Sequence, residues 1–302
     1  MEPREIPPYP ESRPLALEDK PLLDVLFAPL QPRISELTFA SLYLFRHAHG
    51  YRLARIGSAV VVTGRGYDGS PYVLPPLGGE IAAATVRLLE EGLTLYGADR
   101  PFLDANLPEG GYAAVRDRDN FDYLYLKSDL AGLPGNRYHK KRNRISYFLS
   151  RHQPEVEAFG DGHREGCHRL LDEWQRVRAG IESRSLLMEA AAAREGIELA
   201  GRLGLEGVVV LVDGAVKGFA LGERLNRETA VCHFEKADPF LEGVYQLVDR
   251  EFNRLLFTDC ACVNREQDLG EANLRESKLS YHPVELVEKY LVRKETNRGG
   301  TG

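Results

Sequence analysis

The sequence predicts an α/β (α+β) protein with two domains in tandem, each a mixed, mainly antiparallel sheet flanked by helices. The first observation is length, because 302 residues suffice for two domains of about 150 residues each. The second is composition, since 43% hydrophobic and 28% charged residues are typical of globular domains with a buried core. The third is the order of predicted elements, which occurs roughly twice along the chain.

The first half of the chain begins with a proline-rich arm, residues 1–14, which cannot form a helix or a central strand. We expect an N-terminal domain over residues 15–153. Helical periodicity predicts helices at 17–27, 35–47 and 79–91. Short β-rich runs bounded by turns predict strands at 51–56, 58–63, 71–74, 112–115 and 121–126. A basic helix over 136–151 ends this domain.

The second half, residues 154–294, shows a similar order of elements. A strand at 156–159 and helices at 164–177 and 186–203 come first. A meander follows at 207–212, 216–223 and 228–234, with the turn pair Asp213-Gly214 in its first hairpin. The domain closes with a helix, strand, helix and strand at 243–256, 259–263, 271–280 and 284–291. This order is typical of an acetyltransferase-like domain, and residues 295–302 are expected to form a disordered tail.

Composition and short motifs exclude several classes of protein. The longest aliphatic runs, 59–62 and 208–212, are far shorter than the ~20 residues that cross a bilayer, and the N-terminus lacks a signal peptide's apolar region. We therefore expect a cytoplasmic protein without a transmembrane segment. The four cysteines show neither a pairing pattern nor zinc-ligand spacing, so we expect no metal site.

Residues 64–69 match the pattern G-x-G-x-x-G, which in the right context binds a dinucleotide. The following segment, 70–76, contains three prolines and cannot be the helix that would hold a pyrophosphate. The glycines therefore predict a hairpin turn. A G-x-S-x-G motif and a P-loop are both absent, which removes the sequence support for a serine hydrolase or an NTPase.

Positive charge is concentrated in residues 136–151, which contain six Lys or Arg and no acid in a chain of net charge −6. On a helix, Tyr138, Ile145, Phe148 and Leu149 share an apolar face beside a stripe of cations. The stripe predicts phosphate binding by Arg137, Lys140, Lys141 and Arg144. The alternative is a solvated face that balances nearby carboxylates such as Asp117, Asp119 and Asp122.

Aromatic side chains alternate along the predicted strand at 121–126, where Tyr123 and Tyr125 share one face. Such rings could stack a base or line a substrate pocket. The alternative is an edge strand with one packed face, which needs no ligand.

The densest polar stretch follows the strand at 259–263 and contains Asn264, Arg265, Glu266, Asp268, Arg275, Lys278 and Tyr281. Central strands of α/β domains carry sites at their ends, and so many polar groups are costly there unless they pair with each other or with a ligand. We expect Arg275 and Lys278 to face one cleft from a helix. The alternative is an internal ion-pair network that joins the arginines to Glu266 and Asp268.

Three segments carry a resemblance to a known family. They are Asp117–Tyr125, Leu133–Asn143 and Asn264–Gly270 continued by Leu274–Pro283. Over about residues 15–290 the chain resembles a bacterial family that is grouped with the C-terminal catalytic domain of the phosphatidylglycerol lysyltransferases. The resemblance implies two acetyltransferase-like domains in tandem. The same architecture occurs in the aminoacyltransferases of peptidoglycan bridges, which use aminoacyl-tRNA.

The resemblance leads to an aminoacyltransferase as the main hypothesis, with aminoacyl-tRNA as donor and an amine or hydroxyl acceptor. Acyl transfer needs a cation at the oxyanion, for which Lys278 or Arg275 is suited, and a proton acceptor, for which Asp268 or Glu266 is suited. Asn264, Arg265, Tyr281, Tyr123 and Tyr125 would bind the substrate. The acceptor stays open among small molecules, lipids and peptides, although the absence of a membrane-spanning half argues against a lipid.

Two alternatives remain: a coenzyme A-dependent N-acyltransferase, and a non-catalytic module that binds an anionic ligand or partner. No cofactor is expected. Coenzyme A is disfavoured because residues 238–244 lack the Gln/Arg-x-x-Gly-x-Gly/Ala loop that holds its pyrophosphate in acetyltransferases. The oligomeric state is open.

Overall fold

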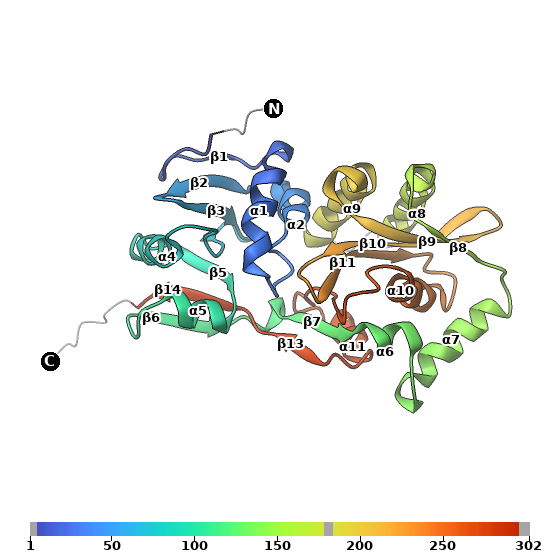
Figure 1. Cartoon of the computed structure of the whole chain (residues 1–302). Helices are drawn as coiled ribbons and strands as arrows, with labels where there is room; N and C mark the ends of the chain where they lie inside the picture. The colour runs from blue at the N-terminus through green and yellow to red at the C-terminus, as the bar shows by residue number, and fades with distance from the viewer. Residues whose placement is uncertain (1–4, 178–183, 296–302) are drawn as a thin grey trace. The chain divides into compact units, whose positions relative to one another are not determined.

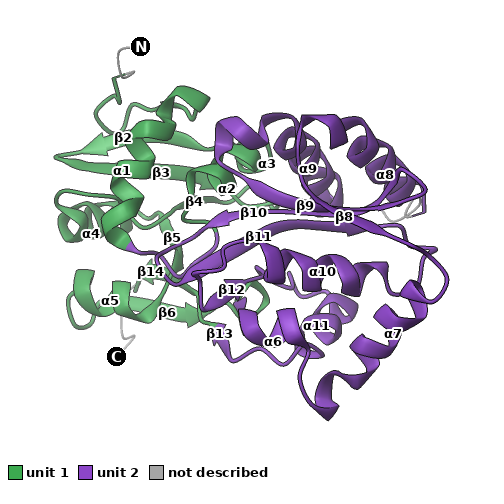
Figure 2. Cartoon of the chain, turned by 45° about the vertical axis from the view of Figure 1, so that its right-hand side comes forward, with its two compact units in different colours: residues 1–30, 36–121, 287–302 green, residues 31–35, 122–286 purple. Residues whose placement is uncertain are grey.

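The structure is a computed structural model that describes residues 5–177 and 184–295 (Figure 1). It divides into two compact units, coloured separately in Figure 2. Unit 1 comprises Met1–Leu30, Glu36–Phe121 and Val287–Gly302, and unit 2 comprises Gln31–Ser35 and Asp122–Leu286. Each unit is built on a mixed sheet of seven strands with helices packed against it, which confirms the predicted fold class.

Unit 1 holds the shorter helices and the N-terminal strands. Its helices are η1 (Leu17–Asp19), α1 (Lys20–Leu30), α2 (Phe39–Leu44), α3 (Arg46–His49), α4 (Ile81–Glu90), α5 (Arg100–Asn106) and η2 (Arg118–Asn120). Its strands are β1 (Arg13–Pro14), β2 (Arg52–Ile56), β3 (Ala59–Arg65), β4 (Pro71–Val73), β5 (Thr94–Ala98), β6 (Tyr112–Arg116) and β14 (Tyr290–Lys294). Their order in the sheet is β1-β2-β3-β4-β5-β14-β6. The described part of the arm thus supplies an edge strand, where proline is tolerated.

Unit 2 holds the longer helices. They are α6 (Lys127–Gly132), η3 (Asn136–Tyr138), α7 (His139–Leu149), η4 (Asp161–His163), α8 (Arg164–Val177), α9 (Arg184–Leu203), α10 (Val244–Leu255) and α11 (Ala272–Leu279). The strands are β7 (Asp122–Leu126), β8 (Glu155–Ala158), β9 (Glu206–Val212), β10 (Ala215–Arg224), β11 (Thr229–Ala237), β12 (Cys262–Asn264) and β13 (Glu285–Val287). Their order is β13-β7-β12-β11-β10-β9-β8.

The meander β8–β11 is antiparallel and supplies four of the seven strands of the unit 2 sheet. Its first hairpin turns at Asp213 and Gly214, with φ values of 50° and 73°, as the Asp-Gly pair predicts for a two-residue turn. Helices α8 and α9 cover one face of this sheet and α10 covers the other (Figure 1). Along α8, Cys167, Leu170, Leu171 and Trp174 are buried at the helical spacing that the sequence showed.

The parallel pairing of β11 with β12 is short and positions the polar segment that follows. It runs only from Thr229↔Cys262 to Val231↔Asn264, although β11 continues to Ala237. Beyond Asn264 the chain stays paired with β7, because Arg265 N donates to Tyr123 O at 2.9 Å. Residues 265–268 therefore diverge from residues 232–237 of β11. We call the region between these two segments the fork.

Most predicted elements are present within one to four residues, but several differ. Strand β5 and helix α5 were not predicted. The single strand expected at 284–291 is two strands, β13 and β14, which belong to different sheets. The helix expected from Ser35 to His47 is broken into α2 and α3, and Thr38 caps α2 by accepting from Ser41 N at 3.1 Å.

The expected domain boundary between residues 153 and 154 differs from the observed division. Strand β7 pairs with β12 and helix α6 packs against α10, so residues 122–153 belong to unit 2. Conversely, β14, which was expected in the C-terminal domain, lies between β5 and β6 in the sheet of unit 1. Residues 1–4 of the arm and 296–302 of the expected tail lie outside the described residues.

Candidate active site

Arg265 lies in the fork, and charged and aromatic side chains surround it. Its Nη2 is 2.9 Å from Glu235 Oε2 on β11, and its Nη1 is 3.1 Å from Asp249 Oδ1 on α10. The guanidinium carbon is 5.0 Å from the ring centre of Tyr281 and 5.8 Å from that of Tyr125. Burial opposes the charge of Arg265, but Asp249 and Glu235 outweigh it and raise its pKa well above the ordinary value.

Asp249 is a carboxylate on the buried side of α10, next to Val248 and one turn before Phe252 and Asn253. Only 2% of its side chain is exposed. Burial raises the pKa of Asp249 to about 7, while the neighbouring Arg265 opposes this rise. The second carboxylate oxygen, Oδ2, has no hydrogen-bond partner among the residues that the structure describes. A buried carboxylate with an unused oxygen is costly, and such groups are concentrated at functional sites.

Lys278 reaches the same region from α11. Its Nζ donates to the carbonyl oxygen of Arg265 and lies 3.5 Å from that of Glu266. The ammonium is also 5.7 Å from the ring centre of Tyr123. Burial, followed by the positive charge of Arg265, lowers the pKa of Lys278 to about 8.

Lys141 approaches from α7 and, like Arg265, lies near Tyr281. Its Nζ donates to Ser280 Oγ at 2.7 Å and lies 3.7 Å from the ring centre of Tyr281. Burial, followed by the charges of Arg265 and Arg144, lowers the pKa of Lys141 to about 8. We use the name fork cluster for Lys141, Glu235, Asp249, Arg265 and Lys278.

Asp268 and Arg275 form an ion pair, and the carboxylate of Asp268 also accepts hydrogen bonds from two other residues. Arg275 donates to both carboxylate oxygens of Asp268, at 3.0 and 2.7 Å, while the Tyr123 hydroxyl and Gly270 N donate at 2.5 and 2.9 Å. The Asp268 side chain is fully buried, and these four bonds use its acceptor capacity. These contacts do not support the expected role of Asp268 as a proton acceptor, and they tie Arg275 to Asp268. They agree instead with the alternative of an internal ion pair.

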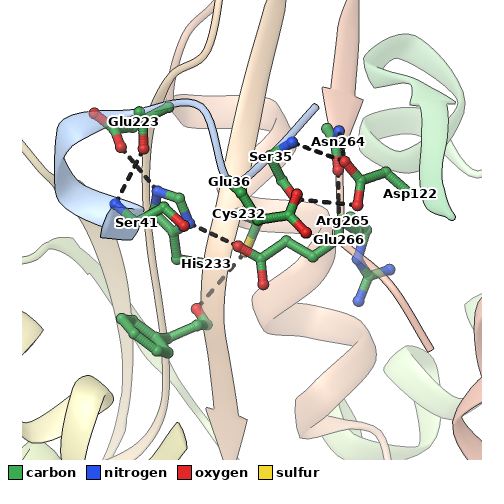
Figure 3. Close-up of polar contacts among 12 residues, drawn as sticks. Ser35, Glu36, Ser41, Asp122, Glu223, Cys232, His233, Asn264, Arg265 and Glu266 are labelled. Atoms are coloured by element: carbon green, nitrogen blue, oxygen red, sulfur yellow. Dashed lines mark hydrogen bonds and ion pairs between the residues drawn. The ribbon is translucent and has the colours of Figure 1, made fainter. Parts of the chain in front are cut away.

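Asn264 is a structural link at the end of β12. Its Nδ2 donates to Asp122 Oδ2 at 2.9 Å and to Arg33 O at 3.1 Å, and its Oδ1 accepts from Glu266 N at 2.7 Å. Asp122 also accepts from Ser35 N at 2.8 Å and Ser35 Oγ at 3.0 Å (Figure 3). Because all polar atoms of the Asn264 side chain are used within the protein, a substrate-binding role is not supported.

Glu266 pairs with a buried histidine and is not a free carboxylate. His233 Nδ1 is 2.7 Å from Glu266 Oε1, and its Nε2 is 2.9 Å from Glu223 Oε1 (Figure 3). Burial opposes protonation, but the two hydrogen-bonded carboxylates outweigh it and raise the pKa of His233 to about 10. His233 is therefore an imidazolium at neutral pH, and Glu266 is one of its two counter-ions.

The aromatic residues proposed for substrate binding are part of the core. The exposed fractions of Tyr123, Tyr125 and Tyr281 are 0%, 1% and 5%. The hydroxyl of Tyr125 donates to Lys278 O at 2.9 Å, so this ring supports the main chain beside the fork cluster. The packed-face alternative is correct for β7, except that this strand lies between β13 and β12 and is not an edge strand. Base stacking on these rings is not supported.

The basic residues of 136–151 separate into two groups. The side chains of Arg137, Lys140 and Arg144 are exposed, and two of them have acidic neighbours, since Arg137 pairs with Asp129 at 2.5 Å and Arg144 lies 3.7 Å from Glu242. Lys141 instead faces Tyr281. Tyr138, Ile145 and Phe148 are buried as expected, whereas Leu149 is 44% exposed, contrary to the prediction.

Helix α7 covers the first turn of α10. A Cβ atom at Gly243, whose φ is 97°, would lie 2.1 Å from the carbonyl oxygen of Arg144. Only glycine permits this approach of the two backbones. The amides at the start of α10 are therefore shielded by α7.

The sequence predicts neither a metal site nor a transmembrane segment, and both features depend on the three-dimensional structure. Within residues 5–177 and 184–295, His, Cys, Asp and Glu side chains form no group of three or more suited to a metal ion. In the same part of the chain, every helix is too short or too polar to span a bilayer.

The sequence analysis did not single out Glu235 or Asp249, although Asp249 leaves a signal. Asp249 occupies a position of α10 that helical periodicity assigns to the buried side, between Tyr245 and Phe252. A carboxylate there calls for a buried partner. The identity of that partner, Arg265, depends on how β11 and β12 diverge.

Comparisons with known proteins identify relatives over nearly the whole chain. A conserved protein of unknown function from Bacteroides thetaiotaomicron has a crystal structure that is 28% identical, with a TM-score of 0.86 over 94% of this chain and 99% of that one. L-PGS from Bacillus licheniformis is 13% identical, with a TM-score of 0.57 over 84% and 90%, which indicates a shared fold. An uncharacterised protein of Mycoplasmoides gallisepticum is 25% identical over 57% of this chain, and the match spans 56% of that protein's length.

The family comparison includes the segments that first suggested a relationship. The family model for the C-terminal part of phosphatidylglycerol lysyltransferase matches residues 27–293, which include α7, the fork cluster and the Asp268–Arg275 pair. The chain therefore belongs to the family of the phosphatidylglycerol lysyltransferase C-terminal domain.

Proposed function

We propose that the protein is an aminoacyltransferase that moves an amino acid from aminoacyl-tRNA to an amine or hydroxyl acceptor. Family membership supports acyl transfer as the type of reaction. The observation that carries the proposal is the convergence of Lys141, Arg265 and Lys278 on the buried carboxylate of Asp249, with Glu235 also paired to Arg265. Few structural networks keep three cations this close, because their mutual repulsion must be offset by bound negative charge.

Attack on the donor ester places negative charge on the carbonyl oxygen of the ester, and the reaction requires stabilisation of this charge. Lys278 suits this role because two main-chain carbonyls hold its ammonium in place, 5.7 Å from the ring centre of Tyr123. A fixed donor of this kind contributes roughly 2.7–4 kcal/mol to barrier lowering. Arg265 supports it by fixing the carbonyl that Lys278 contacts.

The donor assignment is supported by the surroundings of α7 and α10. The exposed cations Lys140 and Arg144 lie on the same helix as Lys141, so phosphates bound along α7 would lead a nucleic acid end toward the fork cluster. Coenzyme A would need the first turn of α10 for its pyrophosphate, but α7 shields that turn and Glu242 adds a negative charge beside it. We therefore propose tRNA, and not coenzyme A, as the carrier.

The proposal is tested by incubating the protein with tRNA charged with radiolabelled amino acids. The acceptors offered are phosphatidylglycerol vesicles, a peptide with free amines and a mixture of small amines and alcohols. We expect the label to move to one acceptor class with the wild type. Lys278→Ala should slow transfer by about 10²–10³-fold. Lys294→Ala, which removes a lysine that is 49% exposed on β14, is the matched control and should transfer normally.

Two results would contradict the proposal. One is a wild type that leaves every aminoacyl-tRNA intact in the presence of all acceptors. The other is micromolar binding of acetyl coenzyme A in calorimetry, which would favour the coenzyme A-dependent alternative.

A further inference from the structure

Lys141 differs from the other cations of α7 in its surroundings. Lys140 and Arg144, on the same helix, are exposed, whereas the Lys141 ammonium lies 3.7 Å from the ring centre of Tyr281. Its one hydrogen-bond partner among the described residues is Ser280 Oγ, at 2.7 Å. Lys141 therefore belongs to the fork cluster and not to the exposed stripe.

The two lysines of the fork cluster differ in what holds their charge. Lys278 donates to two carbonyl oxygens, which favour the ammonium form. Lys141 contacts a hydroxyl, and Ser280 Oγ itself donates to Ser277 O at 2.6 Å. A neutral Lys141 can keep its bond to Ser280 with one N–H and still present a free lone pair.

The charged groups facing Lys141 come from three other elements as well as its own. Arg265, which follows β12, and Arg144 on α7 favour the neutral amine. Asp249 on α10 and Glu235 on β11 favour the ammonium, but their effect is smaller. The result is a pKa of about 8, so the neutral amine is more accessible near neutral pH for Lys141 than for lysine in a model peptide.

Three carboxylates of this region, Asp268, Glu266 and Asp249, are poorly placed to accept a proton from a substrate. Asp268 is saturated by four hydrogen bonds, and Glu266 is paired with His233. Asp249 has an unused oxygen, but only 2% of its side chain is exposed, so a substrate cannot contact it. Lys141 is only half-buried, unlike Asp249.

We propose that Lys141 is the proton acceptor of the transfer step, a role that rests on the aminoacyltransferase function proposed above. As the acceptor's nitrogen or oxygen bonds to the ester carbon, its proton passes to Lys141 Nζ. Lys278 stabilises the oxyanion that forms. The bond between the ester carbon and the ribose oxygen then breaks, and the Lys141 ammonium gives the proton to that oxygen. The amine is thereby restored and no other reactant is consumed.

The pH dependence of kcat/KM tests this role with two variants. In the wild type we expect kcat/KM to rise with pH towards 8 and then to fall, because Lys141 must lose its proton while Lys278, whose pKa is also about 8, must keep its own. Lys141→Arg keeps a positive charge for tRNA phosphates but cannot accept a proton near neutral pH. Both Lys141→Arg and Lys141→Ala should lose about 10²–10⁴-fold in kcat, and neither should show the rise with pH. Lys141→Arg should keep the wild-type KM for aminoacyl-tRNA.

The opposite behaviour of Lys141→Arg would overturn the proposal. If the arginine restored transfer and kept the rise near pH 8, Lys141 would act only through its charge, and the aminoacyltransferase function would still stand. Circular dichroism of each variant separates loss of proton acceptance from loss of folding.

A second measurement does not depend on transfer. Brief labelling of the wild type with trace acetic anhydride at a series of pH values, followed by mass spectrometry of peptides, gives the pKa of each labelled lysine. We expect a midpoint near 8 for Lys141, below the value of about 10.4 for lysine in model peptides. An ordinary midpoint for Lys141 would overturn the proposal even if the wild type is active. A wild type that transfers nothing would instead overturn the proposed function, and the role of Lys141 with it.

Discussion

Unit 2 contains two polar networks that differ in how completely their groups are paired. The first, which we call the anchor network, consists of Ser35, Asp122, Asn264, Asp268 and Arg275, and its buried carboxylates each accept several hydrogen bonds. The second is the fork cluster, in which Asp249 has an unpaired oxygen and both lysines have a pKa of about 8. The two networks are contiguous in sequence, because Asn264, Arg265 and Asp268 lie within one short segment.

The contrast shows that polar density alone does not identify a site. In the anchor network each charge has a partner in the protein, so the groups stabilise the ends of β7 and β12 and little capacity is left for a ligand. In the fork cluster the positive charges are not fully offset, which favours binding of an anion or a developing negative charge. Four experiments test this difference between the two networks.

The largest effect on stability is expected in the anchor network. Asp268→Ala should lower the free energy of unfolding by about 3 kcal/mol, because it leaves Arg275 and the buried Tyr123 hydroxyl without their acceptor. Urea denaturation measures this loss. Arg275→Ala should cost less, and the double variant should be more stable than the sum of the two losses predicts. If Asp268→Ala folds as well as the wild type but loses transfer, Asp268 belongs with the fork cluster.

The pH dependence of stability should differ between His233, whose two ring nitrogens are both paired with carboxylates, and Asp249, whose carboxylate has one unpaired oxygen. His233, closed between Glu223 and Glu266, has a pKa of about 10 when folded, above its ordinary 6.5. Its stabilising contribution is therefore complete below pH 6.5 and is lost as the pH rises through 10. The difference in unfolding free energy between the wild type and His233→Gln should shrink by up to a few kcal/mol over this range. A constant difference would show that His233 is neutral in the folded protein.

Asp249 in the fork cluster should act in a lower pH range. Its folded pKa of about 7 lies above the ordinary 3.8, so its contribution is complete below about pH 4 and is lost as the pH rises through 7. Relative to Asp249→Asn, the wild type should lose stability between pH 4 and 7, which denaturation at several pH values measures. A wild type that gains stability over this range would indicate that Arg265 holds Asp249 ionised throughout.

The smallest effect concerns the exposed stripe on α7. Replacing both Lys140 and Arg144 by alanine should leave folding unchanged, because both side chains are exposed. The log-log dependence of tRNA affinity on salt should flatten by about 0.7–0.9 for each phosphate that the variant no longer binds. Filter binding at several salt concentrations gives this slope. An unchanged slope would leave these residues as surface charge that balances carboxylates such as Glu242.

The sequence predicted most helices and strands because their signals are local. The spacing of Cys167, Leu170, Leu171 and Trp174 specified α8, and the pair Asp213-Gly214 specified the hairpin of β9 and β10. Strand β5 was missed because Gly97, with φ of 69°, interrupts a run that is too short for periodicity to be clear. The polar segment 264–283 was singled out in the sequence as the candidate site, but the roles of its members were not separable there.

The pairing between strands that are distant in the chain is visible only in the tertiary structure. The strand expected at 284–291 is divided between two sheets, since β13 lies beside β7 while β14 pairs with β5 and β6. No local pattern specifies which sheet a strand joins, because the choice depends on the burial that the whole fold gains.

Patterns in the sequence predicted the fold class, the order of most elements, the family and the polar segment proposed to carry the site, because periodicity and motifs depend on residues close in the chain. The tertiary structure decided which of those polar groups are free for chemistry. It paired Asp268 with Arg275, placed Asp249 and Glu235 beside Arg265 and turned Lys141 toward Tyr281. Burial and neighbouring charge set the pKa values of these groups, and both depend on residues that are distant from one another in the chain.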